Sequence, residues 1–215
     1  MFAPVQNDFK NVSLPMFNFC PSCASKNITF NEGKLFRCPD CNFTFYHNIA
    51  AATGCLITVP SNESVSHIEK PIVSRKTKWS EKFVFLIRGK EPAIGKLDLP
   101  GGFIDIGEGV IEGLFRELKE ELNWTPPIPE GLSLTGIFKL FASFSNVYHY
   151  KGINYNTCDM YFHISAPGLK PEDLRLEKSE IAGVLFLKPE DIDFSTFAFQ
   201  STVKAVKTYL ELPLN

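Results

Sequence analysis

Three glutamates lie close together in the run GFIDIGEGVIEGLFRELKEELNW, which spans residues 102–124. Glu117, Glu120 and Glu121 are spaced three and four residues apart, so on an α-helix they are neighbours on the surface. Carboxylate oxygens gathered in this way suit Mg²⁺ or Mn²⁺, ions that keep several waters and bind alongside phosphates. An acidic, solvated helix face is the alternative interpretation of this segment.

The apolar residues of the same stretch predict the helix that carries these glutamates. At about 100° per residue they fall within one arc of the helix, which is enough to bury one face. They are Val110, Ile111, Leu114, Phe115, Leu118 and Leu122. Glu121 lies at the edge of this arc, where a carboxylate needs a partner. Arg116 can pair with Glu112 and Glu120, each four residues away.

A Pro-Gly turn precedes this predicted helix. Residues 97–103 read as a strand that ends at Pro100 and Gly101, where glycine lets the backbone approach a ligand closely. From Gly102 onward the residues follow the pattern G-x5-E-x7-R-E-L-x-E-E, which resembles the signature of the Nudix hydrolases. Asn123 stands where a glycine usually ends that motif, and asparagine tolerates the left-handed conformation of a helix C-cap.

The resemblance implies a metal-dependent enzyme that hydrolyses a nucleoside diphosphate linked to another moiety. The ligands that it implies for Mg²⁺ or Mn²⁺ are the Gly102 carbonyl, Glu117, Glu120 and Glu121. Arg116 and Glu108 resemble supporting residues of the site. Glu120 is the first candidate for the general base that activates the attacking water.

Some members of this family place the base outside the motif, on a loop before a late strand. Glu177 and Glu180 occupy a comparable stretch here, just before the apolar run at residues 181–187. They are therefore secondary candidates for the base. Ordinary exposed acids on a loop are the alternative interpretation.

A second motif lies upstream and consists of two CxxC pairs separated by fourteen residues: Cys20 with Cys23, and Cys38 with Cys41. Four thiolates at this spacing satisfy tetrahedral Zn²⁺, so we predict a zinc ribbon in which the metal is structural. Redox chemistry is the rival interpretation, but it needs one pair at the start of a helix. Cys55 and Cys158 read as small buried residues within strands.

A four-cysteine ribbon followed directly by a Nudix domain resembles the NADH pyrophosphatase subgroup, over roughly residues 18–123. Residues 45–50 are part of this resemblance. That subgroup carries an SQPWPFPxS segment after the motif, whereas the comparable residues 139–148 read KLFASFSNVY. We therefore expect this chain to share the order of domains of that subgroup. NADH is then one candidate substrate beside ADP-ribose and sugar nucleotides.

The 215 residues, 44% of them hydrophobic, are enough for one substantial core and a small module held by metal. We expect an N-terminal arm at residues 1–17, the zinc ribbon at 18–48 and the Nudix domain at 49–215. The predicted fold class is α/β. The resemblance implies an α/β/α sandwich with a mixed sheet, which strands interleaved with two helices fit.

Apolar runs predict strands at 51–59, 82–88, 132–142, 146–151 and 153–165, a polar loop at 60–80 and a closing helix at about 198–210. In the loop, residues 75–79 offer cations and a tryptophan for phosphates or a base, with a solvated loop as the alternative. Five aromatic residues are candidates either for base stacking or for packing on the sheet: Phe141, Phe144, Tyr148, Tyr150 and Tyr155.

The net charge of −2 provides no broad basic field, which disfavours general nucleic-acid binding, and no run of eighteen apolar residues predicts a membrane span. Without an apolar secretory segment at the start, a reducing cytoplasm is the expected location. The expected partner is a nucleotide-derivative substrate, and homodimers are common in the family that the sequence resembles. The rival class is a non-catalytic nucleotide sensor, or an RNA- or DNA-binding protein that uses the ribbon.

Overall fold

The computed structural model describes residues 17–31, 35–60 and 81–212. The chain divides into two compact units between Ile49 and Ala50. Nearly all of the predicted arm and the whole segment at 75–79 lie outside the described residues. Within the described ranges, no helix is long and apolar enough to cross a membrane.

The first unit contains a small antiparallel sheet whose strands lie side by side in chain order: β1 (Thr29–Asn31), β2 (Leu35–Arg37) and β3 (Thr44–Tyr46). The described part of this unit buries only three residues, Cys20, Phe36 and Cys38. A unit this small, with so little apolar burial, needs another source of stability.

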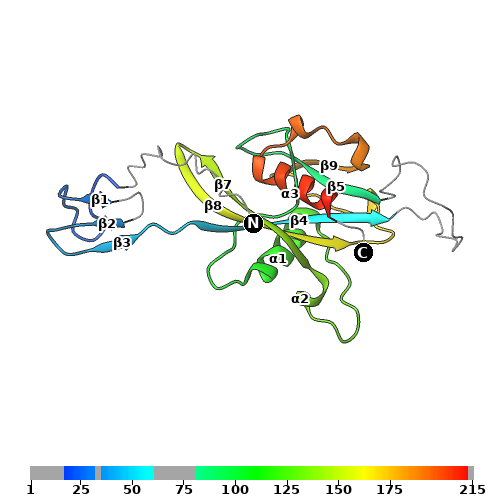
Figure 1. Ribbon diagram of the computed structural model, residues 1–215, viewed down its shortest axis with the longest axis horizontal. Coiled ribbons are helices and arrows are strands. Elements are labelled where there is room, and N and C mark those ends of the chain that lie inside the picture. Colours follow the sequence, from blue (N-terminus) through cyan, green and yellow to red (C-terminus); the bar gives the residue numbers. More distant parts are fainter. Residues whose placement is uncertain (1–16, 32–34, 61–80, 213–215) are drawn as a thin grey trace, which may run out of the picture. The chain divides into compact units, whose positions relative to one another are not determined.

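The second unit is built on a mixed six-stranded sheet (Figure 1). Its strands are β4 (Ala50–Pro60), β5 (Glu81–Arg88), β6 (Leu97–Asp98), β7 (Lys139–Tyr150), β8 (Ile153–Ser165) and β9 (Ile181–Leu187). Their order is β6-β5-β4-β8-β7, with β9 paired to β5. β4 and β8 run parallel and the other pairs are antiparallel, which confirms the predicted mixed sheet.

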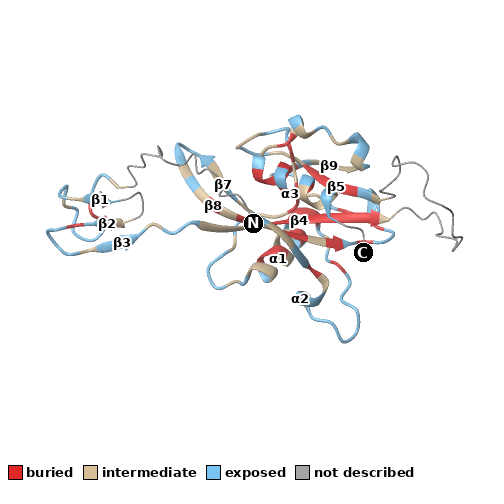
Figure 2. Cartoon of the chain, viewed as in Figure 1, coloured by how far each residue is buried: buried red, intermediate tan, exposed pale blue. Residues whose placement is uncertain are grey.

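Helices cover both faces of this sheet and complete the predicted α/β/α sandwich (Figure 1). On one face, α1 (Val110–Leu122) buries Leu114 and Leu118 in the same apolar cluster as strand residues of β4, β5 and β8. On the other face, α3 (Gln200–Glu211) does the same through Val203 and Val206. Figure 2 shows that buried residues follow β4 and the helix sides that face the sheet.

One predicted strand is wrong over half its length. The run 132–142 contains the short helix α2 (Leu134–Ile137), which begins after Ser133, a residue type favoured at helix starts. β7 then begins at Lys139 and continues to Tyr150, so residues 143–145 do not interrupt it. Ser143 and Ser145 are exposed while their neighbours are partly covered, which is the alternation of one strand rather than a break.

The remaining helices are short 3₁₀ turns in the loops that connect β8, β9 and α3: η2 (Pro171–Asp173), η3 (Pro189–Asp191) and η4 (Phe194–Thr196). The closing helix predicted at about 198–210 is observed as α3. The long join at 60–80 connects β4 to β5, which pair antiparallel from Ile57 to Pro60. β4 and β5 therefore form a hairpin, and residues 61–80 of the predicted loop lie outside the described residues.

Candidate functional site

The helix that carries the glutamates has defined ends. At its start, the backbone N–H of Gly109 donates a hydrogen bond of 2.6 Å to the carboxylate of Glu112, half of a capping box. Glu112 thus bonds to the backbone rather than to Arg116, its predicted partner. At its end, Asn123 has φ 47° and ψ 36°, the left-handed conformation expected where the motif usually has glycine.

Glu121 lies on the side of α1 that faces the sheet, and it is buried. Its Oε2 accepts a hydrogen bond of 2.8 Å from the backbone N–H of Gly101, so the partner of this carboxylate is the Pro-Gly turn. Desolvation raises the pKa of Glu121 well above its usual value, and the nearby charge of Glu117 raises it further. The Gly101 bond acts in the opposite direction but does not compensate for the burial.

Arg116 bonds to the other carboxylates of the helix. Its guanidinium donates to both oxygens of Glu108, at 2.7 and 3.0 Å, and to the carbonyl oxygen of Phe103 at 3.0 Å. One terminal nitrogen, Nη1, donates to Glu117 at 2.9 Å and to Glu120 at 3.1 Å. Arg116 therefore fixes the positions of two of the three motif carboxylates relative to the turn.

The turn before α1 brings its backbone close to these side chains. Gly101 has φ +143°, and a Cβ there would lie 2.2 Å from the carbonyl oxygen of Thr53, so only glycine fits. A Cβ on Gly102 would lie 2.5 Å from Oε1 of Glu117. The Gly102 carbonyl accepts a hydrogen bond of 2.9 Å from the Thr53 N–H. The turn and Glu117 therefore share one small space.

Most of these groups line a single cavity of about 290 Å³ in the second unit. Its described lining contains seven carboxylates and two cations: Asp98, Asp105, Glu117, Glu120, Glu121, Asp159 and Glu180, with Arg88 and Lys90. Both cations are already paired, Arg88 with Asp98 at 3.1 Å and Lys90 with Glu180. The cavity therefore carries a surplus of negative charge.

This surplus fits a divalent cation. Desolvation raises the pKa of Glu117, and the charges of Glu120 and Glu180 add to the effect, although Arg116 opposes it. A buried hydroxyl that lines the same cavity, Oγ1 of Thr53, has no hydrogen-bond partner among the described residues. Carboxylate, carbonyl and hydroxyl oxygens are the hard donors that Mg²⁺ and Mn²⁺ accept.

The three motif carboxylates do not themselves form a tight cluster. Among the described residues, the four cysteines are the one group of three or more such side chains placed closely enough to hold a metal ion as they stand, with their sulfurs within 4.8 Å of one another. Instead, Arg116 bridges Glu117 and Glu120, and Glu121 points to the turn. The donors are thus assembled around one cavity, with room left between them.

Of the two acids on the late loop, Glu180 lines the cavity. It forms an ion pair with Lys90, and both side chains are partly exposed. Glu177 is not among the lining residues, and its carboxylate accepts hydrogen bonds from the N–H and the hydroxyl of Ser179 at 3.1 and 2.8 Å. The structure therefore favours Glu180 over Glu177 as the second candidate base.

Of the five aromatic candidates, Tyr148 lines the cavity. Its ring centroid lies 5.3 Å from that of Phe103 and 5.5 Å from that of Phe199, and these two rings also line the cavity. Phe141 and Phe144 instead pack in the apolar cluster beside α3. One wall of the cavity is therefore aromatic, and Phe103 and Phe199 were not among the aromatic residues predicted to take part in it.

Residues of β8 form a polar wall that was not predicted from the sequence. Thr157, Asp159 and Tyr161 all line the cavity, and Asp159 is buried. They occupy alternate positions of the strand, so their side chains lie on one face of the sheet. The signal in the sequence is a set of polar groups at every second position of an otherwise apolar run.

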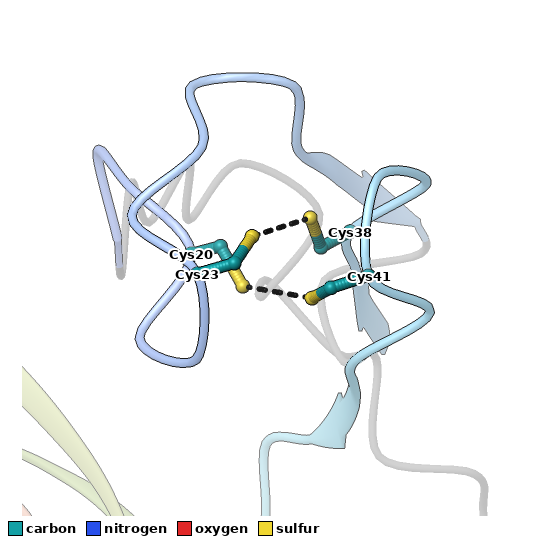
Figure 3. Close-up of side chains that lie close together, drawn as sticks. All are labelled: Cys20, Cys23, Cys38 and Cys41. Atoms are coloured by element: carbon teal, nitrogen blue, oxygen red, sulfur yellow. Dashed lines mark hydrogen bonds between the residues drawn. The ribbon is translucent and has the colours of Figure 1, made fainter.

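The four cysteines of the first unit point toward one another (Figure 3). The sulfur atoms of Cys20 and Cys41 are 3.6 Å apart, as are those of Cys23 and Cys38. A disulfide would bring two sulfurs to about 2.05 Å. Four sulfurs around a tetrahedral zinc, each about 2.3 Å from it, lie about 3.8 Å from one another. All four sulfurs lie within 4.8 Å of one another, so the cluster could hold one metal ion.

The two cysteine pairs have the same local structure. In each, the backbone N–H of the first cysteine donates to the carbonyl five residues later, at 2.8 and 2.9 Å. Ala24 and Asn42, each directly after the second cysteine of its pair, both have φ 60°. Asp40 joins the two pairs, because it accepts hydrogen bonds from Ser25 at 2.5 Å and from Asn27 at 2.6 Å.

The family model of the Nudix domain matches residues 72–206, which is more than half of the chain. The chain therefore belongs to the Nudix family, and the resemblance seen in the motif is confirmed. The fold and the four-cysteine cluster agree with a Nudix domain that follows a ribbon. The narrower resemblance to NADH pyrophosphatases stays a prediction.

Solved structures of Nudix proteins share this fold. A Nudix hydrolase from Nitrosomonas europaea aligns over 90% of both chains with a TM-score of 0.56 and 23% identity. The Nudix domain of Shewanella oneidensis NrtR, solved in complex with ADP-ribose, aligns over 80% of this chain and 91% of that domain with a TM-score of 0.54 and 14% identity. At these identities the likeness establishes the fold.

A curated relative is more similar in sequence over a shorter stretch. The ADP-ribose pyrophosphatase of Methanocaldococcus jannaschii is 42% identical over 57 residues, which are 26% of this chain and 32% of that protein. The alignment thus spans about a third of the relative's length.

Proposed function

We propose that this chain hydrolyses the diphosphate bond of ADP-ribose or a related nucleotide derivative with the help of Mg²⁺ or Mn²⁺. The observation that carries the proposal is a cavity lined by seven carboxylates and by two cations that are both already paired. A diphosphate would be repelled from such a cavity unless divalent cations entered with it. The names of the archaeal relative and of the NrtR complex support the substrate class.

In this proposal, Glu117, Glu120, Glu121 and the Gly102 carbonyl hold the metal ion. When bound, the ion neutralises phosphate charge and favours ionisation of a water. Burial of Glu121 matters here, because a desolvated carboxylate with a raised pKa gains more from a cation than an exposed one does. NADH and sugar nucleotides remain candidate substrates beside ADP-ribose.

The remaining roles fall to side chains of the same helix and loop. Arg116 is a positioning residue because it bonds to Glu117 and Glu120, and Glu108 is one because it holds Arg116; neither lines the cavity. Glu120, the most exposed of the motif glutamates, accepts a proton from water, and Glu180 is the second candidate for this task. The water oxygen bonds to one phosphorus while the bridging P–O bond breaks, which gives a nucleoside monophosphate and a phosphorylated remainder.

The test is a substrate panel with matched variants. Wild-type protein and the variants Glu120→Gln, Glu180→Gln and Glu190→Gln are assayed with Mg²⁺ on ADP-ribose, NADH, a dinucleoside polyphosphate and a sugar nucleotide. Glu190 is an exposed acid outside the cavity and serves as the control. We expect Glu120→Gln to lower kcat about 10²- to 10⁴-fold. Its Tm should stay within about 2 °C of the wild-type value.

Two results would contradict this proposal. Near-wild-type turnover by Glu120→Gln together with a large loss in Glu180→Gln would transfer the role of base to Glu180. Binding of these nucleotides by the wild type without turnover of any of them would instead favour the sensor interpretation.

The proposal extends to the whole chain. The cysteine cluster holds a structural Zn²⁺, the ribbon occupies residues 18–48 between an arm at 1–17 and the hydrolase domain at 49–215, and homodimer formation stays a family-based prediction. The expected location is the cytoplasm, where six cysteines stay reduced. Zinc analysis and size measurement of the purified protein check the metal and the assembly.

A further inference from the structure

The cavity extends from the glutamates of α1 to a second wall made by β7, β8 and the start of α3. Glu117 on one side and Asp159 on the other both line it, with the turn at Gly101 and Gly102 between them. If the diphosphate is held at the glutamates, as the proposed function requires, another part of the substrate occupies the opposite wall. The chemistry of that wall therefore bears on which substrates fit.

Asp159 is the central polar group of this wall. Its Oδ1 accepts a hydrogen bond of 2.5 Å from the Thr157 hydroxyl, and its Oδ2 accepts one of 2.7 Å from the Ser201 hydroxyl. No cation among the described residues pairs with it, although it is buried. Ser201 lies in the first turn of α3, where the helix dipole favours a carboxylate. A buried acceptor is thus held ready at the cavity surface.

A chain of hydroxyls keeps Asp159 in place. The Tyr161 hydroxyl lies 3.5 Å from Oδ2 of Asp159 and 3.3 Å from the hydroxyl of Thr202. Thr202 in turn donates to Asp98 at 2.9 Å, and Asp98 pairs with Arg88. The groups in this chain are buried or partly buried, and they lie on four elements: β8, α3, β6 and β5. The carboxylate is therefore preorganised for one orientation.

Asn146 provides a donor on the same face. It pairs across the sheet with Thr157, two positions before Asp159, and it also lines the cavity. Its Oδ1 accepts a hydrogen bond from the N–H of Val147 at 2.9 Å, while its amide N–H groups have no partner among the described residues. The wall thus offers an acceptor, Asp159, beside a donor, Asn146.

Aromatic rings flank this acceptor and donor. Tyr148 follows Asn146 on the same face of β7, and Phe199 directly precedes α3. Their centroids are 5.5 Å apart, too close for a planar ring to enter between them but suited to stacking on an outer face. Stacking of a base on an aromatic side chain contributes about 1–3 kcal/mol. The wall therefore suits a flat, polar heterocycle.

We propose that Asp159 selects the nucleobase of the substrate by accepting an N–H from an exocyclic amino group, with Asn146 donating to the adjacent ring nitrogen. This inference rests on the proposed function for the placement of the diphosphate. Adenine and cytosine present an amino donor beside a ring acceptor, whereas hypoxanthine and uracil present a carbonyl beside a ring N–H. A carboxylate that faces a carbonyl is repulsive, so bases with the carbonyl pattern are rejected.

A ribose diol is the other donor that a carboxylate recognises, but the groups around Asp159 favour the base. The flanking rings of Tyr148 and Phe199 give a flat partner more contact than they give a puckered sugar. The free amide N–H groups of Asn146 also need an acceptor, and an amino base has a ring nitrogen beside its amino group. The diol is therefore an outcome that the experiment must separate.

The experiment measures affinity and turnover for substrates that differ only in this pattern. Pairs of ADP-ribose with inosine diphosphate ribose, and CDP-glucose with UDP-glucose, are tested with Mg²⁺ against wild type, Asp159→Asn and the exposed control Asp191→Asn. Affinities are measured by calorimetry in the Glu120→Gln background, so that hydrolysis is not needed for the measurement. The wild type and the control should prefer the amino base in at least one pair by about 10- to 100-fold.

Asp159→Asn should abolish or reverse that preference, because its amide can donate to the carbonyl. The change should appear in KM and Kd more than in kcat. If Asp159→Asn fails to fold, Thr157→Val, which removes the 2.5 Å hydrogen bond to Asp159, should reduce the preference. Equal affinities in both pairs for the wild type, or a preference that survives in Asp159→Asn, would overturn the inference. If the wild type binds 2′-deoxy-ADP-ribose more weakly than ADP-ribose, and Asp159→Asn does not, Asp159 contacts the ribose diol instead.

Failure of the proposed function produces a different result. In that case no substrate is hydrolysed by the wild type, yet the preference for the amino base still appears in the binding data. If the substrates are hydrolysed but neither base is preferred, the proposed hydrolase function is supported and the role of Asp159 is rejected.

Discussion

Two regions of this chain gather side chains that suit metal ions, and they differ in what else those side chains contact. The four cysteine sulfurs face one another, with all of them within 4.8 Å of each other. The glutamates of α1 instead contact protein groups: Glu117 and Glu120 bond to Arg116, and Glu121 bonds to the turn at Gly101. One set is closed on itself, and the other is spread around a cavity.

The difference corresponds to the two kinds of metal site in proteins. A structural site uses every coordination position for protein ligands and contributes folding energy, whereas a catalytic site leaves positions for water and substrate. The unit with the cysteines buries only three described residues, so we expect its fold to depend on an ion held by the proposed zinc site. The unit with the glutamates has two apolar clusters of its own, so its fold does not.

The largest effect is expected from disrupting the closed site, which is the cluster of four cysteines. Cys38→Ser removes one of four zinc ligands, and because structural zinc contributes on the order of 10 kcal/mol in small modules, the first unit should unfold. Zinc content should fall below one ion per chain, and amides of the described residues 17–31 and 35–49 should lose protection from hydrogen exchange. Cys158→Ser, in β8 and outside the cluster, is the control and should keep its zinc. Full protection in metal-free Cys38→Ser protein would contradict the closed-site account.

A smaller effect is expected from weakening the contacts that hold the glutamates of α1, which form the open site. Arg116→Lys keeps the charge but cannot reproduce the fork that contacts Glu108, Glu117 and Glu120 together. We expect kcat/KM to fall about 10- to 100-fold, since hydrogen bonds to charged groups contribute about 1.5–3 kcal/mol each. The zinc content should not change. Unaltered kinetics would show that these contacts do not position the glutamates.

The smallest effect concerns stability and pH. The pKa of Glu121 is raised in the folded protein by desolvation, so its ionisation opposes folding. The metal-free protein should therefore lose stability as pH rises from about 4.5, the ordinary value, through the raised pKa. Glu121→Gln should flatten this slope.

The measurement is the free energy of unfolding of the second unit, taken from its transition in urea. It is made at pH 5 and pH 7.5, with and without Mg²⁺. At ten times its Kd, Mg²⁺ should add about 1.4 kcal/mol at the higher pH. It should add less at pH 5, where protons compete for the carboxylates, and less in Glu121→Gln. An equal effect of Mg²⁺ on both proteins at both pH values would remove Glu121 from the metal site.

Features that depend on local spacing were predictable from the sequence. The arc of apolar residues placed α1, the Asn123 substitution predicted a left-handed cap, and the CxxC spacing predicted the sulfur cluster. In each case the residues that interact are close in the chain, or share a motif that fixes their geometry. Apolar runs placed most of the strands and α3, whereas the mixed-sheet α/β/α arrangement was implied by the resemblance to the Nudix family.

The far wall of the cavity was not predictable in this way. Asp159, Asn146 and Phe199 come together only because β7 pairs with β8 in one register and α3 folds back over them. The choice of partner for Arg116 had a similar cause, because the turn brings Glu108 to the guanidinium while Glu112 caps the helix. Such contacts depend on tertiary structure, which single-sequence patterns do not encode.

The central claim is that the α1 carboxylates receive a divalent ion together with the diphosphate. Anomalous diffraction at the manganese edge, from crystals soaked with Mn²⁺ and a non-hydrolysable ADP-ribose analogue, tests it most directly. The account predicts a manganese peak bounded by Glu117, Glu120, Glu121 and the Gly102 carbonyl, with the diphosphate of the analogue beside it. A bound analogue with no such peak, and with Glu117 and Glu120 still on Arg116, would contradict it.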